Sequence, residues 1–162
     1  MISRESISKR FVVICIVSAS LLILLFSILL ANNIGKTRFL GTPSVTSANG
    51  FNFNIENINI DQSSNTLQIK GWVFIKGESI DTVNTNIVLR NTKTGKCYQL
   101  PTQMMRRPDV AQQFKNAEDY SKSGFLSITK INKLDSSKYD ILLKYGNDNK
   151  NILIRTNKQV II

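Results

Sequence analysis

The chain of 162 residues contains no histidine. Histidine is the usual general base, the commonest metal ligand and the central residue of most nucleophilic triads, so its absence excludes those sites. The sequence also lacks a phosphate-binding glycine loop and any spaced set of metal ligands. We therefore expect no cofactor and no metal, and we expect the protein not to be an enzyme.

One catalytic alternative survives the lack of histidine. A pair of carboxylates can hydrolyse a glycosidic bond, and Asp109, Glu118 and Asp119 lie in the one irregular segment of the chain. Closeness in sequence does not show that two carboxyl groups stand about 5–9 Å apart, as that chemistry requires. A histidine-independent, glycan-active enzyme stays as a remote alternative.

Cysteine is also rare, with Cys15 inside a long apolar run and Cys97 far outside it. If the apolar run crosses a membrane, the two thiols cannot meet, and no intramolecular disulfide stabilises the chain. We expect Cys97 to be a small buried residue, as free cysteines commonly are. An intermolecular disulfide is the alternative.

The feature that organises the chain is its apolar segment at residues 11–31, which is interrupted only by three serines. Twenty-one helical residues at about 1.5 Å each span about 31 Å, the thickness of a bilayer's hydrocarbon core. The run is longer than the core of a cleaved signal peptide, and Leu29 and Leu30 stand where a cleavage site needs small residues. The segment is predicted to be an uncleaved signal-anchor helix.

The flanks of this helix indicate its orientation. Residues 1–10 carry three basic side chains and one acidic one, and such a short basic tail favours the cytoplasmic side. We expect residues 1–10 to be a cytoplasmic tail, in a protein that crosses the cell membrane once. Residues 32–49 are small, polar and broken by glycine and proline, which is typical of a linker. Residues 50–162 are then an extracytoplasmic domain.

That domain has the alternating pattern of β-strands. The predicted strands cover residues 51–60, 66–77, 87–89, 97–100, 125–131, 139–145, 151–155 and 159–162. A change of phase near Glu56 and Asn57 indicates a β-bulge in the first of them. Residues 101–120 interrupt the pattern, with a short helix beginning at Pro108. The fold class is therefore all-β, an antiparallel immunoglobulin-like sandwich of about 7–9 strands with one short helix.

Three aromatic residues are assigned structural roles. Tyr139 follows Leu134 and a turn, which is the layout of a tyrosine corner, where the phenol hydrogen-bonds to the backbone upstream. A tyrosine that merely opens a strand has the same spacing. Gly71 beside Trp72 suggests an indole packed against a strand without a side chain, and Phe125 is expected in the core.

An ordered set of short motifs carries a resemblance. The motifs are Gly71-Trp72-Val73-Phe74, Arg107-Pro108-Asp109-Val110, Tyr120, Ser123-Gly124-Phe125 and Tyr139-Asp140-Ile141. Together they resemble a little-characterised extracytoplasmic β-sandwich domain of bacterial envelope proteins, over about residues 65–155. The resemblance implies a domain that occurs behind a membrane anchor, or attached to proteins of surface-polysaccharide assembly, and it implies no catalytic residues.

The charge of the chain bears on its partners. Lys and Arg number 21 against 11 Asp and Glu, a net charge of +10, and 18 and 10 of these lie beyond the helix. Such a balance favours anionic partners, although scattered lysines also simply solvate a surface. The aromatic residues and motifs of nucleic-acid binding are missing, so we expect no nucleic-acid partner.

Arg106, Arg107 and Asp109 are the candidate binding residues. Arg107 and Asp109 flank Pro108, so one alternative is an ion pair that tethers the loop to the sandwich. In the other alternative, Arg106 and Arg107 face outward and hold a phosphate or carboxylate. The expected function is a non-catalytic, membrane-anchored accessory module that contacts a membrane protein or the polysaccharide machinery. Direct binding of an anionic cell-wall glycopolymer is the alternative.

Overall fold

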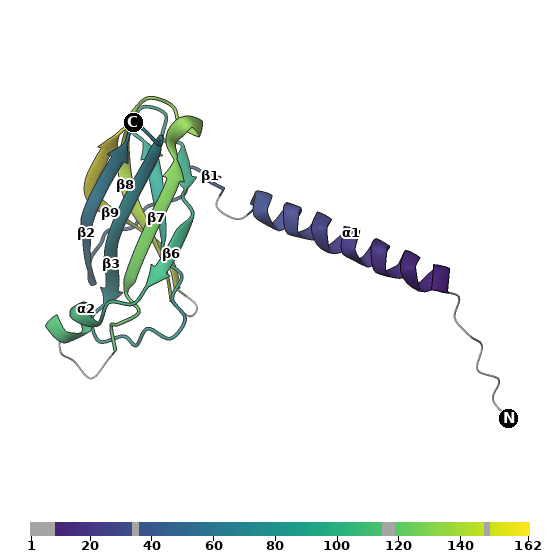
Figure 1. Ribbon diagram of the computed structural model, residues 1–162. Coiled ribbons are helices and arrows are strands. Elements are labelled where there is room, and N and C mark those ends of the chain that lie inside the picture. Colours follow the sequence, from purple (N-terminus) through teal and green to yellow (C-terminus); the bar gives the residue numbers. More distant parts are fainter. Residues whose placement is uncertain (1–8, 34–35, 115–118, 148–149) are drawn as a thin grey trace. The chain divides into compact units, whose positions relative to one another are not determined.

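The structure is a computed structural model that describes residues 9–33, 36–114, 119–147 and 150–162. The chain divides into two compact units, Met1–Ile34 and Gly35–Ile162. Figure 1 labels the helix described in the first unit and most of the strands of the second.

The first unit is the helix α1, Lys9–Asn33. Within it, Lys9–Leu30 has a mean hydropathy of 3.0, and the segment is long and apolar enough to cross a membrane. The hydroxyls of Ser18, Ser20 and Ser27 donate hydrogen bonds of 2.8–3.0 Å to carbonyl oxygens three or four residues earlier. Because these bonds satisfy the hydroxyls inside the helix, the serines do not interrupt its apolar character.

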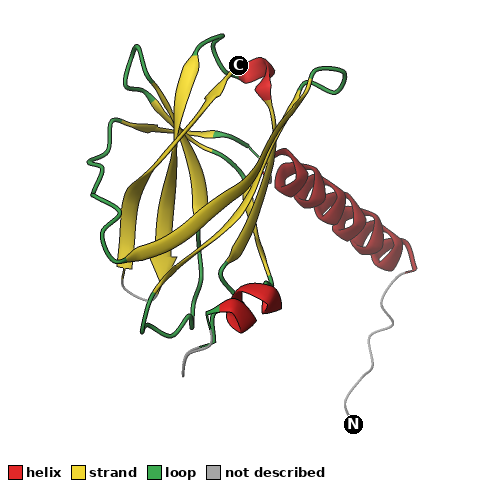
Figure 2. Ribbon diagram, turned by 90° about the vertical axis from the view of Figure 1, so that its left-hand side faces the viewer, coloured by secondary structure: helices red, strands yellow, loops and turns green. Residues whose placement is uncertain are grey.

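The second unit consists of two antiparallel sheets, which Figure 2 shows as separate layers. One sheet has the order β1-β5-β4-β8-β9, with strands Arg38–Gly41, Cys97–Gln99, Asn86–Asn91, Lys138–Asn147 and Lys150–Ile161. The other has the order β2-β3-β7-β6, with strands Phe51–Asp61, Thr66–Ile75, Gly124–Lys130 and Thr102–Met105. A short helix α2, Pro108–Gln113, and a 3₁₀ turn at Ile131–Lys133 complete the described elements. The expected all-β sandwich with one short helix is confirmed.

Period-two alternation separates the core from the outer faces. On β3, Leu67, Ile69 and Val73 point into the main core between the sheets, whereas Trp72 and Phe74 point to the opposite face. Phe125 on β7 is fully buried in the main core, as expected. Each strand therefore contributes one set of side chains to the core and presents the other on the outside.

The predicted bulge and the tyrosine corner are both present. The pairing of β2 with β3 shifts register between Ile55 and Asn57, where the phase of the sequence changes. The Tyr139 hydroxyl donates a hydrogen bond of 2.9 Å to the carbonyl oxygen of Asp135. The role expected of Gly71 is wrong in detail, because a Cβ there would lie 2.1 Å from the Asn54 carbonyl oxygen and 2.8 Å from the Phe125 ring. The glycine makes room for the bulged strand and for Phe125, and the indole lies on the other face.

Three expectations about the elements are wrong. The linker predicted at residues 32–49 contains β1, which pairs with β5, and Thr46 donates its backbone N–H to the carbonyl oxygen of Leu153. The segment expected to interrupt the β pattern contains β6, which pairs with β7. The strands predicted at 151–155 and 159–162 are one strand, β9, with a register shift opposite Ile141 and Leu142 and a positive φ at Asn157.

Candidate functional site

Arg107 lies between two carboxylates. Its Nη1 and Nη2 donate hydrogen bonds of 2.7 Å to both carboxylate oxygens of Glu56 on β2. Its Nε and Nη2 donate bonds of 2.9 and 2.5 Å to Asp109 in the first turn of α2. The guanidinium holds the pKa of Asp109 down, at about 2, and both carboxylates raise the pKa of the guanidinium.

This arrangement decides between the two sequence alternatives for Arg107. The tether to Asp109 is present, and Glu56 is a second partner 51 residues away that the sequence did not suggest. With a side chain only 12% exposed and four of its N–H groups donated to carboxylates, Arg107 does not face outward to hold an anion. Arg106 is exposed and makes no hydrogen bond or ion pair within the described parts of the chain.

The clamp formed by Arg107, Glu56 and Asp109 holds α2 over a second, smaller core. Trp72 and Phe74 stack at 5.5 Å between ring centroids, and Phe74 stacks on Tyr120 at 4.1 Å. Val110 of α2 is buried against this group, and Phe114 meets Trp72 edge to face. Several residues of the resemblance motifs therefore form, with Phe114, an aromatic cap on the outer face of the four-stranded sheet. Figure 1 shows α2 beside one end of β3.

Gly124 completes the clamp. A Cβ at this position would lie 2.5 Å from Cγ of Arg107 and 2.7 Å from the Met105 carbonyl oxygen. The side chain of Arg107 thus crosses β7 where that strand has no side chain, which explains the glycine beside Phe125 in physical terms.

The carboxylates suggested for a glycosidase are not arranged as an acid and a base. Hydrogen bonds from the backbone N–H and hydroxyl of Ser121 hold the pKa of Asp119 below its ordinary value. Asp109 is ionised beside Arg107, and Glu118 lies outside the described residues. Neither described carboxyl has the raised pKa of a general acid. Within the described ranges no group of three or more Cys, Asp or Glu side chains could hold a metal ion.

Cys97 is a buried residue of β5, as expected, and its side chain packs with Val88, Leu142 and Leu153 on the outer face of the five-stranded sheet. Burial raises the pKa of its thiol. Leu40 and Val45, from the segment predicted as a linker, cover this small apolar cluster. The thiol is therefore poorly placed for an intermolecular disulfide.

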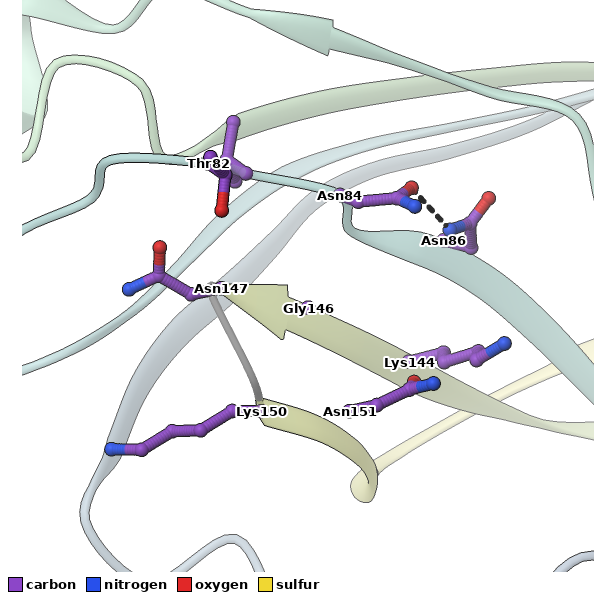
Figure 3. A pocket seen from close by; sticks show the side chains of 9 residues that line it. Thr82, Asn84, Asn86, Lys144, Gly146, Asn147, Lys150 and Asn151 are labelled. Atoms are coloured by element: carbon purple, nitrogen blue, oxygen red, sulfur yellow. Dashed lines mark hydrogen bonds between the residues drawn. The ribbon is translucent and has the colours of Figure 1, made fainter.

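A polar cleft of about 510 Å³ lies on the same outer face, beside that cluster. The register sets Asn86 on β4 directly opposite Lys144 on β8, and Asn151 on β9 opposite Gly146. Figure 3 shows the side chains of Lys144 and Asn151 extending in the same direction. Position 146 requires a glycine because the backbone of Asn84 passes close to it. A Cβ there would lie 2.9 Å from the Asn84 carbonyl oxygen.

The polar groups of the cleft are only partly satisfied by the protein. Asn86 donates to the side-chain oxygen of Asn84 at 2.8 Å and accepts from Gln99 at 3.1 Å, which orients both asparagine amides. The ammonium group of Lys144 makes no hydrogen bond or ion pair with any described residue. Lys150, also on the rim, pairs with Glu78. Asn147 donates to the Ser79 carbonyl, but its side-chain oxygen is buried without a partner in the described chain.

A second hollow of about 310 Å³ adjoins the first. Lys144 and Asn151 line both hollows, and the second is also lined by Pro43, Ser44 and Thr46 and by the apolar side chains of Leu40, Ile152 and Leu153. The sequence did not single out this site. The available signal was weak: Lys144 is one polar residue among the apolar residues of a strand, and that pattern also describes any solvated outer face.

Comparison of the chain with protein-family models, with curated proteins and with solved structures finds no match. The chemistry of the site is therefore argued from its own residues.

Proposed function

We propose that this protein is a non-catalytic binding module of a bacterial envelope. A single span in the cell membrane holds its sandwich on the extracytoplasmic side, with the N-terminus in the cytoplasm. The observation that carries the proposal is the combination of one apolar helix with a sandwich in which Asp61 and Asp109, the carboxylates whose pKa is lowered to about 2, are held by hydrogen bonds from the protein itself. A module of this kind holds a partner near the membrane and does not transform it.

The partner is a membrane protein or a component of cell-surface polysaccharide assembly. The first choice is supported by α1, whose apolar side chains are exposed on all sides and can meet lipid or another helix. The second is the setting that the motifs resemble. Nucleic acid is not expected, because the cleft offers no aromatic side chain on which a base could stack.

Direct binding of an anionic glycopolymer is the second candidate. Arg107 is bound to Glu56 and Asp109, so of the arginine pair only Arg106 is available to an anion. The outer face of the five-stranded sheet has more to offer, because Arg90, Lys144 and Arg155 all lie there.

The sandwich itself is proposed to be immunoglobulin-like. The order β2-β3-β7-β6 corresponds to the A-B-E-D sheet of that fold, and β4-β8-β9 corresponds to C-F-G. The corner tyrosine then opens the F strand, its usual place.

Labelling of intact cells tests the orientation. Lys93 lies exposed in the turn between β4 and β5, and Cys97 is buried, so Lys93→Cys adds a single accessible thiol to the sandwich. A membrane-impermeant maleimide should label Lys93→Cys in intact cells and leave the unsubstituted chain, the matched control, unlabelled. Labelling that appears only after lysis contradicts the orientation. The prediction of an uncleaved anchor helix is contradicted if the mass of the mature protein shows that its first thirty residues have been removed.

A further inference from the structure

We propose that the cleft on the outer face of the five-stranded sheet binds an acidic sugar segment, with Lys144 as the contact for its negative charge. The ligand chemistry is a carboxylate or phosphodiester flanked by sugar or polyol hydroxyls. The inference rests on the proposed function and names the substrate class of that binding module.

The charge of the cleft favours an anion. Nine of the described residues line the larger hollow; two of these are lysines and none is acidic. Lys150 is neutralised by Glu78, so the uncompensated charge is that of Lys144, at the centre of the two hollows. An ammonium that has no partner in the described protein offers three donors to a ligand carboxylate or phosphate.

The amides favour hydroxyl groups next to that charge. Each asparagine side chain offers both a donor and an acceptor, and a sugar hydroxyl needs both. The Asn84 amide is held from one side by Asn86, and its N–H groups make no bond within the described chain. Asn151 is exposed beside Lys144. A polyol supplies donors and acceptors to these two amides.

The shape of the site favours a segment of a chain over a single small molecule. The two hollows together run from Asn84 and Asn86, across Lys144 and Asn151, to Ser44 and Thr46. Both hollows are open to solvent, and no aromatic side chain is among the described residues that line them. A flat base would find no stacking partner there, so a nucleobase fits less well than a sugar.

Binding measurements on the full chain in nanodiscs of uncharged lipid test the proposal. The probes are a galacturonic acid hexamer and a glycerol phosphate hexamer, which separate the carboxylate source from the phosphodiester source. Maltohexaose is the neutral probe and single-stranded DNA the nucleic-acid probe. At least one acidic hexamer should bind the unsubstituted protein more tightly than either maltohexaose or DNA.

Two variants of one strand provide the matched comparison. Lys144→Gln should weaken binding of the acidic hexamer about tenfold, and it should flatten the dependence of log Kd on log salt by about one unit. Lys138→Gln removes the same charge from the exposed start of β8 and should change Kd less than about twofold. Asn151→Asp places a negative charge beside Lys144 and should weaken the acidic hexamer more than maltohexaose. Thermal unfolding of each variant verifies that it is folded.

The outcomes separate this proposal from the function on which it rests. The cleft assignment is overturned if no acidic hexamer binds, if Lys144→Gln binds as the unsubstituted folded protein does, or if DNA binds equally well. In each of these cases, labelling of Lys93→Cys in intact cells would still support the proposed membrane-anchored module. Cleavage of a hexamer would instead overturn the non-catalytic function.

Discussion

Tyr139 donates its hydrogen bond to the Asp135 carbonyl at the turn where the chain passes from the four-stranded sheet to the five-stranded one. The ring is fully buried and meets Tyr98 edge to face at 6.4 Å. A single side chain therefore fixes both the turn and the first residues of β8. At this scale the motif residues Tyr139, Arg107 and Trp72 stabilise the folded state through hydrogen bonds and packing.

Tyr139→Phe should lower the free energy of unfolding by about 1 kcal/mol, because it removes one hydrogen bond from a buried site and leaves the packing intact. Urea unfolding of the full chain in zwitterionic detergent, followed by the fluorescence of Trp72, measures the change. Trp72 is the single tryptophan. Tyr98→Phe is the control, since that hydroxyl makes no hydrogen bond in the described chain. Equal effects of the two substitutions would show that the corner bond contributes nothing.

At the scale of elements, three segments distant in sequence are joined at one point. Arg107 connects α2, through Asp109, to β2, through Glu56, and its aliphatic stem lies against Gly124 of β7. Six residues are too few for a stable isolated helix, so α2 depends on these contacts and on Val110. The aromatic cap beneath it depends in turn on α2.

Arg107→Lys should lower the free energy of unfolding by about 1–2 kcal/mol, because an ammonium cannot donate bidentately to two carboxylates as a guanidinium does. The cap should loosen first, giving faster amide hydrogen exchange at Val110 and Phe114. Arg106→Lys makes the same chemical change one residue earlier, at an exposed side chain, and should change neither quantity. Exchange that accelerates equally in both variants would argue against the clamp.

At the same scale, the elements differ in how well local sequence predicts them. The bulge in β2 follows from a phase change in the apolar pattern, and α2 from Pro108. Strand β6 reads Thr-Gln-Met-Met, with no alternation, and exists because its backbone pairs with β7. In β9, Asn157 adopts a positive φ that asparagine tolerates, so a segment predicted as a break continues as one strand.

At the scale of the whole molecule, acid should destabilise the sandwich. Hydrogen bonds from Ser63 and Ser64 lower the pKa of Asp61 to about 2, and Arg107 does the same for Asp109. A carboxylate with a depressed pKa in the folded state stabilises the protein above its unfolded pKa, near 4, and this contribution is lost as the pH falls toward 2. The free energy of unfolding, measured at constant ionic strength, should therefore decrease between about pH 4 and pH 2.

Asp61→Asn should make that decrease shallower, because one of the groups that take up a proton on unfolding is then absent. Asp61 ends β2 in the four-stranded sheet, whereas the cleft lies on the five-stranded sheet, so binding of the acidic hexamers at neutral pH should be unaffected. A stability that is constant down to pH 2 would show that these hydrogen bonds persist in the unfolded chain.

The sequence by itself determined an apolar helix long enough to cross a membrane, an all-β sandwich, the bulge and the short helix, and it left the tyrosine corner as one of two alternatives for Tyr139. Each follows from composition or from a periodicity within a few residues, which local physics dictates. Only the tertiary structure decided that Arg107 binds Glu56, that residues 38–41 join a sheet, and that Asn86, Lys144 and Asn151 line one cleft. These contacts join residues tens of positions apart through strand register, so no local pattern encodes them.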